Sequence, residues 1–158
     1  MTSPTATAHM AESASAPRRV DLTRFIVPLA RLLFAAIFIM ASLGHFSQQG
    51  IGYGAQEGVP LASVLVPLSG VMSLVGGLSV LLGYRARIGA WLLVVFLIPV
   101  TIIMHDFWAV EDAAMAQLQQ VMFLKNLALL GGALFIARYG AGPFSLDAVR
   151  RAERGGGE

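Results

Sequence analysis

The chain contains no cysteine, which excludes disulfide bonds, thiolate-held iron–sulfur clusters, CxxC redox chemistry and cysteine nucleophiles. It is also poor in charge, since Asp, Glu, Lys and Arg make up 13% of its 158 residues, whereas soluble domains carry about 25%. The sequence holds no glycine-rich phosphate loop, no Rossmann fingerprint and no nucleophile elbow. The protein therefore lacks the groups to complete a redox reaction alone, and it is at most a subunit of an oxidoreductase.

Apolar residues are abundant instead, at 56% of the chain with a mean hydropathy of +0.72. A protein this short cannot hide so much apolar surface from water in its own core. Three long intervals contain no charged residue: residues 32–56, 58–84 and 88–105. A helix needs about 20 apolar residues to cross a bilayer. We therefore expect an all-α membrane protein with crossing helices near residues 25–46, 61–82 and 87–105.

A fourth crossing is expected between residues 113 and 137, but Lys125 divides this segment into two uncharged halves. Neither half is long enough to span a bilayer alone, so the crossing must contain Lys125. The sequence thus predicts a four-helix transmembrane bundle in a single domain over residues 21–147. Residues 1–20 are expected to form a disordered cytoplasmic tail, and residues 148–158 a flexible one.

Basic residues gather on one side of the predicted bundle. Every Lys and Arg except Lys125 lies near the start of the first crossing, in the turn between the second and third, or after the fourth. Because cytoplasmic loops are enriched in Lys and Arg, we expect both termini on the cytoplasmic side of the plasma (inner) membrane. The basic face would meet anionic membrane lipid, so the pI of 9.5 does not require a nucleic-acid partner.

Small residues recur every four positions in two of the predicted helices. Ser69, Ser73 and Gly77 form such a stripe in the second crossing, and Ala128 and Gly132 share the spacing in the fourth. Small residues let membrane helices approach closely. We expect the stripe of the second helix to contact a neighbouring helix.

Lys125 is the most unusual polar residue of the predicted spans. Lys125 comes 13 residues before Arg138, which places it about 20 Å from the cytoplasmic boundary at about 1.5 Å per residue. Because the hydrocarbon core is about 30 Å thick, Lys125 lies roughly 10 Å inside the outer boundary. Its ammonium group either snorkels to the surface or faces the bundle interior and pairs with Asp106 or Glu57. The adjacent Asn126 favours the interior, because two neighbouring polar residues are not expected to face lipid together by chance. Arg31 is the counterpart near the cytoplasmic side, where snorkelling and an interhelical role are about equally expected.

Further polar side chains end the first and third predicted helices. His45 ends the first, and His105 and Asp106 end the third beside Trp108, an expected interface anchor. Polar groups gathered at one end of a bundle are typical of a binding site. The candidate ligand-binding site therefore comprises His45, Glu57, His105, Asp106, Trp108, Lys125 and Asn126. A quinone suits this depth and composition, whereas no metal is expected, because the ligands lack metal-site spacing.

Five segments resemble the DoxX-like family of small four-helix membrane proteins. In chain order they are RLLFAAIFIMASLGHF, GGLSVLLGYRARIGAWLL, HDFW, KNLALLGGAL and GAGPFSLD, within residues 31–147. Many members of that family carry an acidic residue before the paired glycines of the second helix, where this chain has Ser73. The resemblance implies a four-helix fold and, in some members, a membrane subunit of a quinone-linked oxidoreductase.

Two functions follow as hypotheses. The first is a membrane subunit of a quinone-linked redox system, with the polar site near the outer leaflet and a partner redox subunit. The second is a non-catalytic membrane adaptor or assembly factor for a partner complex, in which the polar groups serve only bundle specificity. Small-molecule transport is a weaker third hypothesis, which would require a homodimer to form a pathway.

Overall fold

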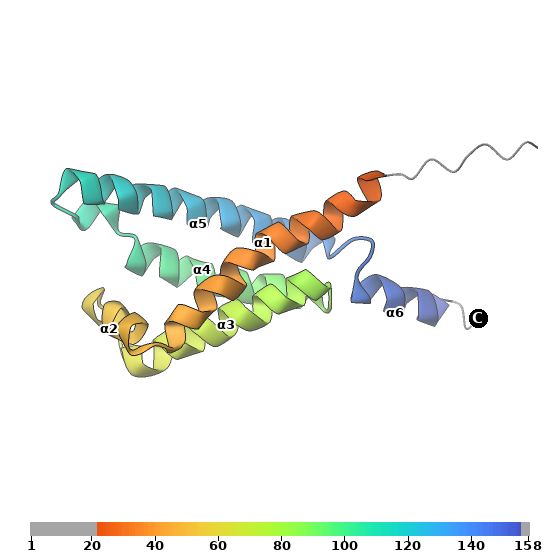
Figure 1. The fold of residues 1–158 in the computed structure, drawn as a ribbon, viewed down its shortest axis with the longest axis horizontal. Helices are drawn as coiled ribbons and strands as arrows, with labels where there is room; N and C mark the ends of the chain where they lie inside the picture. Colours follow the sequence, from red (N-terminus) through yellow and green to blue (C-terminus); the bar gives the residue numbers. More distant parts are fainter. Residues whose placement is uncertain (1–21, 156–158) are drawn as a thin grey trace, which may run out of the picture.

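The computed structural model describes residues 22–155, and they form helices and connecting turns without a strand. The α-helices are α1 (Ile26–Ser42), α2 (Gln48–Gln56), α3 (Ala62–Leu82), α4 (Ala86–Met104), α5 (Ala113–Tyr139) and α6 (Leu146–Gly155). Short 3-10 helices cover Leu22–Phe25, Leu43–Phe46 and Phe107–Ala109. Figure 1 shows α1, α3, α4 and α5 running along the length of the bundle, with α1 crossing obliquely, α2 at one end and α6 at the other. We call these the α2 end and the α6 end.

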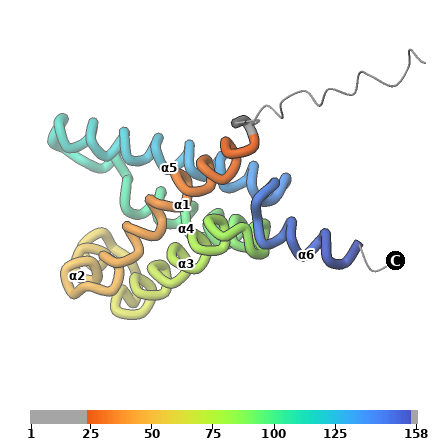
Figure 2. Tube along the Cα trace, turned by 45° about the vertical axis from the view of Figure 1, so that its right-hand side comes forward, coloured from red at the N-terminus to blue at the C-terminus, as the bar shows by residue number. Residues whose placement is uncertain are grey.

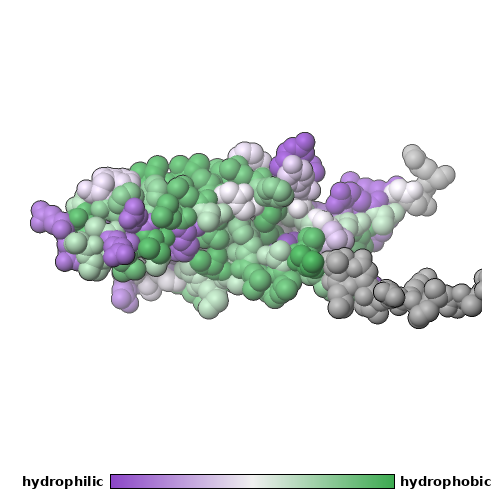
Figure 3. Space-filling view, turned by 90° about the horizontal axis from the view of Figure 1, so that it is seen from above, coloured by the Kyte–Doolittle hydropathy of each residue, from purple (hydrophilic) through white to green (hydrophobic). Residues whose placement is uncertain are grey.

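Four segments of the described chain are long and apolar enough to cross a membrane. They are Ile26–Phe46, Ala62–Leu82, Ala86–Ala109 and Ala113–Tyr139. The space-filling view shows an apolar band over the middle of the molecule, with polar residues toward both ends (Figure 3). The predicted all-α, four-crossing fold is thus confirmed, including a fourth crossing that contains Lys125.

Helix α3 packs between α1 and α4, and α4 also packs against α5 (Figure 2). The core forms where these helices meet, and it consists of Phe38, Val80, Ala90, Leu93, Val94, Phe96, Leu97, Ala133 and Ala137. Many other large apolar side chains point outward. Outward apolar residues are expected of a bundle whose surface faces lipid, because lipid tails are as apolar as these side chains.

The small-residue stripe of α3 lies against α1. Ser73 is buried, and its hydroxyl donates to the carbonyl of Phe38 at 2.9 Å. Gly77 lets Ile39 and Phe38 approach so closely that an added Cβ would lie 3.0 Å from Ile39 Cγ1. The predicted contact is confirmed for α3. In α5, Gly132 packs against Phe34 of α1, whereas Ala128 is exposed.

The α3–α4 turn is built on Gly83, which has a φ of +63°. This left-handed conformation lets the Gly83 amide donate to Val80 and the Tyr84 amide donate to Ser79, closing the end of α3. Gly83 also lies directly against the Arg31 guanidinium and the Ser145 side chain, so any Cβ there would clash. The turn therefore needs glycine for both its conformation and its contacts.

Arg31 of α1 is buried, at 6% exposure. Its Nη1 donates to the carbonyl of Ala141 at 3.2 Å, and its Nη2 donates to that of Phe144 at 2.6 Å. Only its Nε lacks a hydrogen-bond partner within the described residues. Of the two roles considered for Arg31, the structure supports the one inside the protein, because its charge is directed at backbone carbonyls of the segment after α5 rather than at headgroups.

Two helices stand outside the predicted crossings. Helix α6 covers Leu146–Gly155 and so includes the first residues of the predicted flexible tail, residues 148–158; Ser145 caps its first turn by accepting from the Ala148 amide at 3.1 Å. Helix α2 stands where a loop was expected, and Ser47 caps it by accepting from the Gly50 amide at 2.9 Å. The predicted disordered tail, residues 1–20, lies outside the described residues.

Candidate functional site

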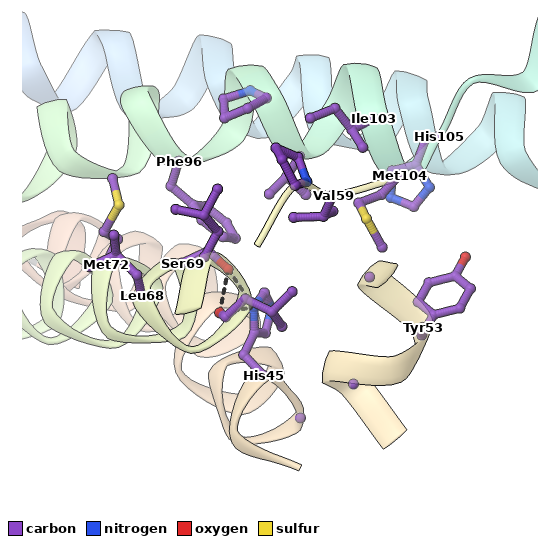
Figure 4. A pocket seen from close by; sticks show the side chains of 18 of the residues that line it. His45, Tyr53, Val59, Leu68, Ser69, Met72, Phe96, Ile103, Met104 and His105 are labelled. Atoms are coloured by element: carbon purple, nitrogen blue, oxygen red, sulfur yellow. Dashed lines mark hydrogen bonds between the residues drawn. The ribbon is translucent and has the colours of Figure 1, made fainter. Parts of the chain in front are cut away.

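An apolar cavity of about 490 Å³ lies at the α2 end, between the 3-10 helix Leu43–Phe46, α2, α3 and α4 (Figure 4). Its walls are almost wholly apolar and include Val59, Leu65, Val66, Leu68, Met72, Val95, Phe96, Val100, Ile103 and Met104. Its few polar side chains are His45, Tyr53, Ser69 and His105. We call this cavity the outer pocket, because the sequence predicts that this end of the bundle lies near the outer leaflet. Apolar pockets of this size with a few placed polar groups are typical of ligand sites.

His45 is fixed on one side of the outer pocket by α3. Its Nδ1 lies 2.8 Å from Ser69 Oγ and 3.3 Å from the Val66 carbonyl oxygen, and the Ser69 hydroxyl itself donates to that carbonyl at 2.7 Å. Both oxygens can therefore only accept, so the proton sits on Nδ1. In the neutral ring, Nε2 is then a hydrogen-bond acceptor. The ring of Phe96, 5.9 Å away, packs beside the imidazole.

His105 and Tyr53 lie together on another side of the pocket (Figure 4). His105 Nδ1 lies 2.7 Å from Gln119 Oε1 of α5 and donates to it, which again leaves Nε2 as an acceptor. Burial raises the pKa of the Tyr53 phenol; contact with Gln119 opposes this shift, and the nearby carboxylates of Glu57 and Asp106 reinforce it. Tyr53 and Gln119 were not predicted as site residues, because Tyr53 lies on the unexpected helix α2 and Gln119 has no sequence signal of its own.

The structure brings together only part of the predicted site. His45 and His105 both line the outer pocket, whereas Glu57 and Asp106 lie near its Tyr53 side without lining it. Trp108 is 60% exposed and packs edge-on against Phe107 and Phe123, as an interface anchor would.

Of the two alternatives for Lys125, the structure supports the exposed side chain rather than the interior ion pair. Its side chain is exposed on α5, and its Nζ lies 3.5 Å from Met122 Sδ. Asn126 is buried at 5% exposure. The two differ because consecutive residues point about 100° apart around a helix of 3.6 residues per turn. Their adjacency thus carried no information about which of them faces inward.

Within residues 22–155, no group of three His, Cys, Asp or Glu side chains is arranged to hold a metal ion. What the outer pocket offers is an apolar volume with imidazole acceptors at its edges. This chemistry is suited to an apolar group that carries an N–H or O–H donor.

Comparison with known proteins identifies the family. A model of the SURF4 family matches residues 57–152 of the chain. The inner membrane protein YqjF of Escherichia coli (strain K12) is 28% identical over 121 residues, covering 77% of this chain and 88% of YqjF. The inner membrane protein YphA of the same organism is 27% identical over 123 residues, covering 75% of this chain and 86% of YphA.

A eukaryotic protein is also similar. The Surfeit locus protein 4 homolog of Schizosaccharomyces pombe is 26% identical over 116 residues, which cover 73% of this chain but 35% of that protein. No solved structure matches the chain.

These matches correct the resemblance to the DoxX-like family, which is wrong. The segments behind it are short apolar helices with paired glycines and a basic turn, and such features suit many small four-helix membrane proteins. The family model instead covers α3 to α6 as one continuous unit. The chain is an integral membrane protein of the SURF4 family.

Proposed function

We propose that this protein is a non-catalytic membrane adaptor that holds an apolar segment of a partner protein in the outer pocket. The observation that carries the proposal is the pocket itself, a cavity of about 490 Å³ whose wall is apolar except for a few side chains at its edges. Flexible Met72 and Met104 line it, and methionine adapts readily to apolar partners of varied shape.

The polar groups of the pocket also suit binding of a polypeptide. His45 and His105 each donate the ring N–H to an oxygen of the protein, on Ser69 and Gln119 respectively. Their remaining nitrogens accept hydrogen bonds, which suits the backbone N–H groups of a polypeptide.

The distribution of charge supports an orientation for this adaptor. The arginines of the described chain lie toward the α6 end, and the α2 end carries Glu57, Asp106, Glu111 and Asp112. Under the positive-inside rule the α6 end is cytoplasmic and the outer pocket faces the other side of the inner membrane. A partner would then reach the pocket from the extracytoplasmic side or from the outer leaflet.

Site-specific photo-crosslinking in intact membranes tests the proposal. A photoreactive phenylalanine analogue at Ile103 would lie in the pocket, whereas the same analogue at the neighbouring Ile102 would point to lipid, since Ile102 is exposed and outside the pocket. We expect polypeptide adducts, identified by mass spectrometry, at position 103 and not at position 102. Adducts with lipid alone at both positions would overturn the adaptor function.

A quinone-linked redox subunit is the second candidate, favoured by the convergence of His45 and His105 on one apolar pocket. Its ligand would be the reduced quinol, because the two imidazole acceptors match hydroxyl donors rather than quinone carbonyls. Extraction of the purified protein should then yield quinol or quinone in a fixed ratio, and His45→Phe should abolish it. Protein that takes up no quinol at any concentration would exclude this candidate.

A further inference from the structure

A second cavity, of about 420 Å³, lies at the α6 end between the start of α4, the end of α5 and α6. Five arginines line it: Arg85, Arg87, Arg150, Arg151 and Arg154. Asp147 is the one carboxylate among its lining residues within the described chain. We call this cavity the arginine pocket. Its positive charge exceeds its negative charge by four, counting five arginines against one aspartate.

The single carboxylate does not neutralise the arginines. Asp147 Oδ1 accepts from the Arg85 backbone amide at 2.8 Å, and Oδ2 accepts from the Ala86 amide at 3.0 Å. Asp147 thereby caps the start of α4 instead of pairing with a guanidinium. Arg151 Nε donates to the Asp147 backbone carbonyl at 3.1 Å. The charge of the five guanidinium groups is therefore available to an anion.

Tyr84, in the turn beside the pocket, lies close to these positive charges. The Arg150 guanidinium lies 4.4 Å from the centre of its ring. Contact with Arg150, together with the charges of Arg150 and Arg85, lowers the pKa of the Tyr84 phenol. The direction of this shift agrees with a surplus of positive charge at the edge of the pocket.

An apolar groove continues from the arginine pocket along the bundle surface. It has a volume of about 590 Å³, lies between α3 and α4, and shares Arg85 and Ile88 with the pocket. Its further walls include Val75, Leu78, Leu82, Trp91, Leu92 and Val95. From Ile88 to Val95 the groove follows α4 for about 10 Å at the usual helical rise. It therefore runs from the charged end of the bundle into the apolar band that faces lipid.

The two cavities meet at the level where phospholipid headgroups lie. Gly83, Tyr84 and Arg85 separate the crossing segments that end at Leu82 and begin at Ala86. Tyr139, at the end of α5, lines the pocket, and tyrosine is enriched at membrane interfaces. An anion bound by the arginines would thus have an apolar groove directly beneath it.

We propose that the arginine pocket binds the phosphate headgroup of an anionic phospholipid, with an acyl chain lying along the groove between α3 and α4. Arginine forks match phosphate oxygens in geometry, and basic pockets between transmembrane helices bind anionic headgroups. The groove distinguishes this ligand from free phosphate, which would leave the apolar walls unused. The site lies at the end opposite the outer pocket and is independent of the adaptor function.

Trp91 provides the test, because it lines the groove and the chain has two tryptophans. A Trp108→Phe background leaves Trp91 as the only tryptophan. In phosphatidylcholine vesicles, phosphatidylglycerol with brominated acyl chains should quench Trp91 fluorescence at about tenfold lower mole fraction than brominated phosphatidylcholine. Excess inorganic phosphate should not restore the fluorescence, since a free anion gains nothing from the groove.

Two double variants with the same change in charge locate the site. Arg87→Gln with Arg154→Gln removes two pocket arginines, and Arg24→Gln with Arg138→Gln removes two arginines outside it; all four are exposed. The first pair should abolish the preference for phosphatidylglycerol, and the second should retain it. Equal quenching by both lipids in the parent protein, equal loss in both pairs, or recovery of fluorescence with phosphate would each overturn the proposal.

Discussion

The two ends of the bundle use polar residues in opposite ways. At the α6 end, outside the group of arginines that line the arginine pocket, Arg31 and Asp147 are engaged in hydrogen bonds to backbone groups distant in sequence, as between Arg31 and the carbonyl of Ala141, 110 residues later. At the α2 end, polar side chains surround an apolar cavity and leave the Nε2 acceptors of His45 and His105 available. The comparison teaches that polarity alone does not mark a site. What matters is whether the protein's own groups use up the hydrogen-bonding capacity.

The largest predicted effect on stability is at Arg31, whose hydrogen bonds give the α6 end its structural role. Replacing Arg31 with Met should lower the free energy of unfolding by about 3 kcal/mol, because two backbone carbonyls lose a charged donor. Equilibrium unfolding in mixed detergent–SDS micelles measures this change. Arg24→Met, at an exposed arginine of the same end, should cost less than about 0.5 kcal/mol. Equal losses in the two variants would remove the distinction between the ends.

A smaller loss is expected at Asp147, which joins α6 to the start of α4. Asp147→Ala removes both hydrogen bonds to the Arg85 and Ala86 amides and should cost about 1–2 kcal/mol, as for other helix caps. Hydrogen exchange should also become faster at the Arg85 and Ala86 amides. Unchanged exchange there would mean that α6 does not hold this turn.

The contact between α1 and α3 gives a reference in the middle of the bundle. Ser73→Ala removes a buried hydrogen bond to Phe38 and should cost about 1 kcal/mol in the same unfolding assay. Ser63→Ala, at an exposed serine on the same helix, serves as its control and should be neutral. A neutral Ser73→Ala would indicate that the glycines alone determine this packing.

The smallest effect is expected at Lys125. Since its side chain is exposed on α5, Lys125→Met should change the free energy of unfolding by less than about 0.5 kcal/mol. It should also leave crosslinking at position 103 intact. A loss as large as that of Arg31→Met would instead mean that Lys125 pairs with an acid inside the bundle.

The sequence predicted the crossings well because hydropathy over about 20 residues is a local property that the bilayer imposes. It could not tell that Lys125 points outward and Asn126 inward, since the facing of α5 depends on which side meets α4. Arg31 was undecided for a similar reason, because its acceptors at Ala141 and Phe144 are remote in sequence.

Helix α2 was missed because its sequence, QQGIGYGAQ, is glycine-rich and lacks an apolar stripe. The outer pocket was therefore only half predicted. Its two histidines end the first and third crossings and could be identified from sequence. Tyr53 and Gln119 come from segments without such a signal, and the pocket unites His45, His105 and Tyr53 only once α2 folds over α3.

The most direct test of the account combines the crosslink at position 103 with blocking of the outer pocket. Gly44 lines the pocket and Gly52 does not, and an added Cβ meets no atom within 4 Å at either position. Gly44→Trp should fill the pocket and abolish the polypeptide adduct, while Gly52→Trp should leave it unchanged. Persistence of the adduct in the Gly44→Trp protein would contradict the claim that a partner segment occupies the outer pocket.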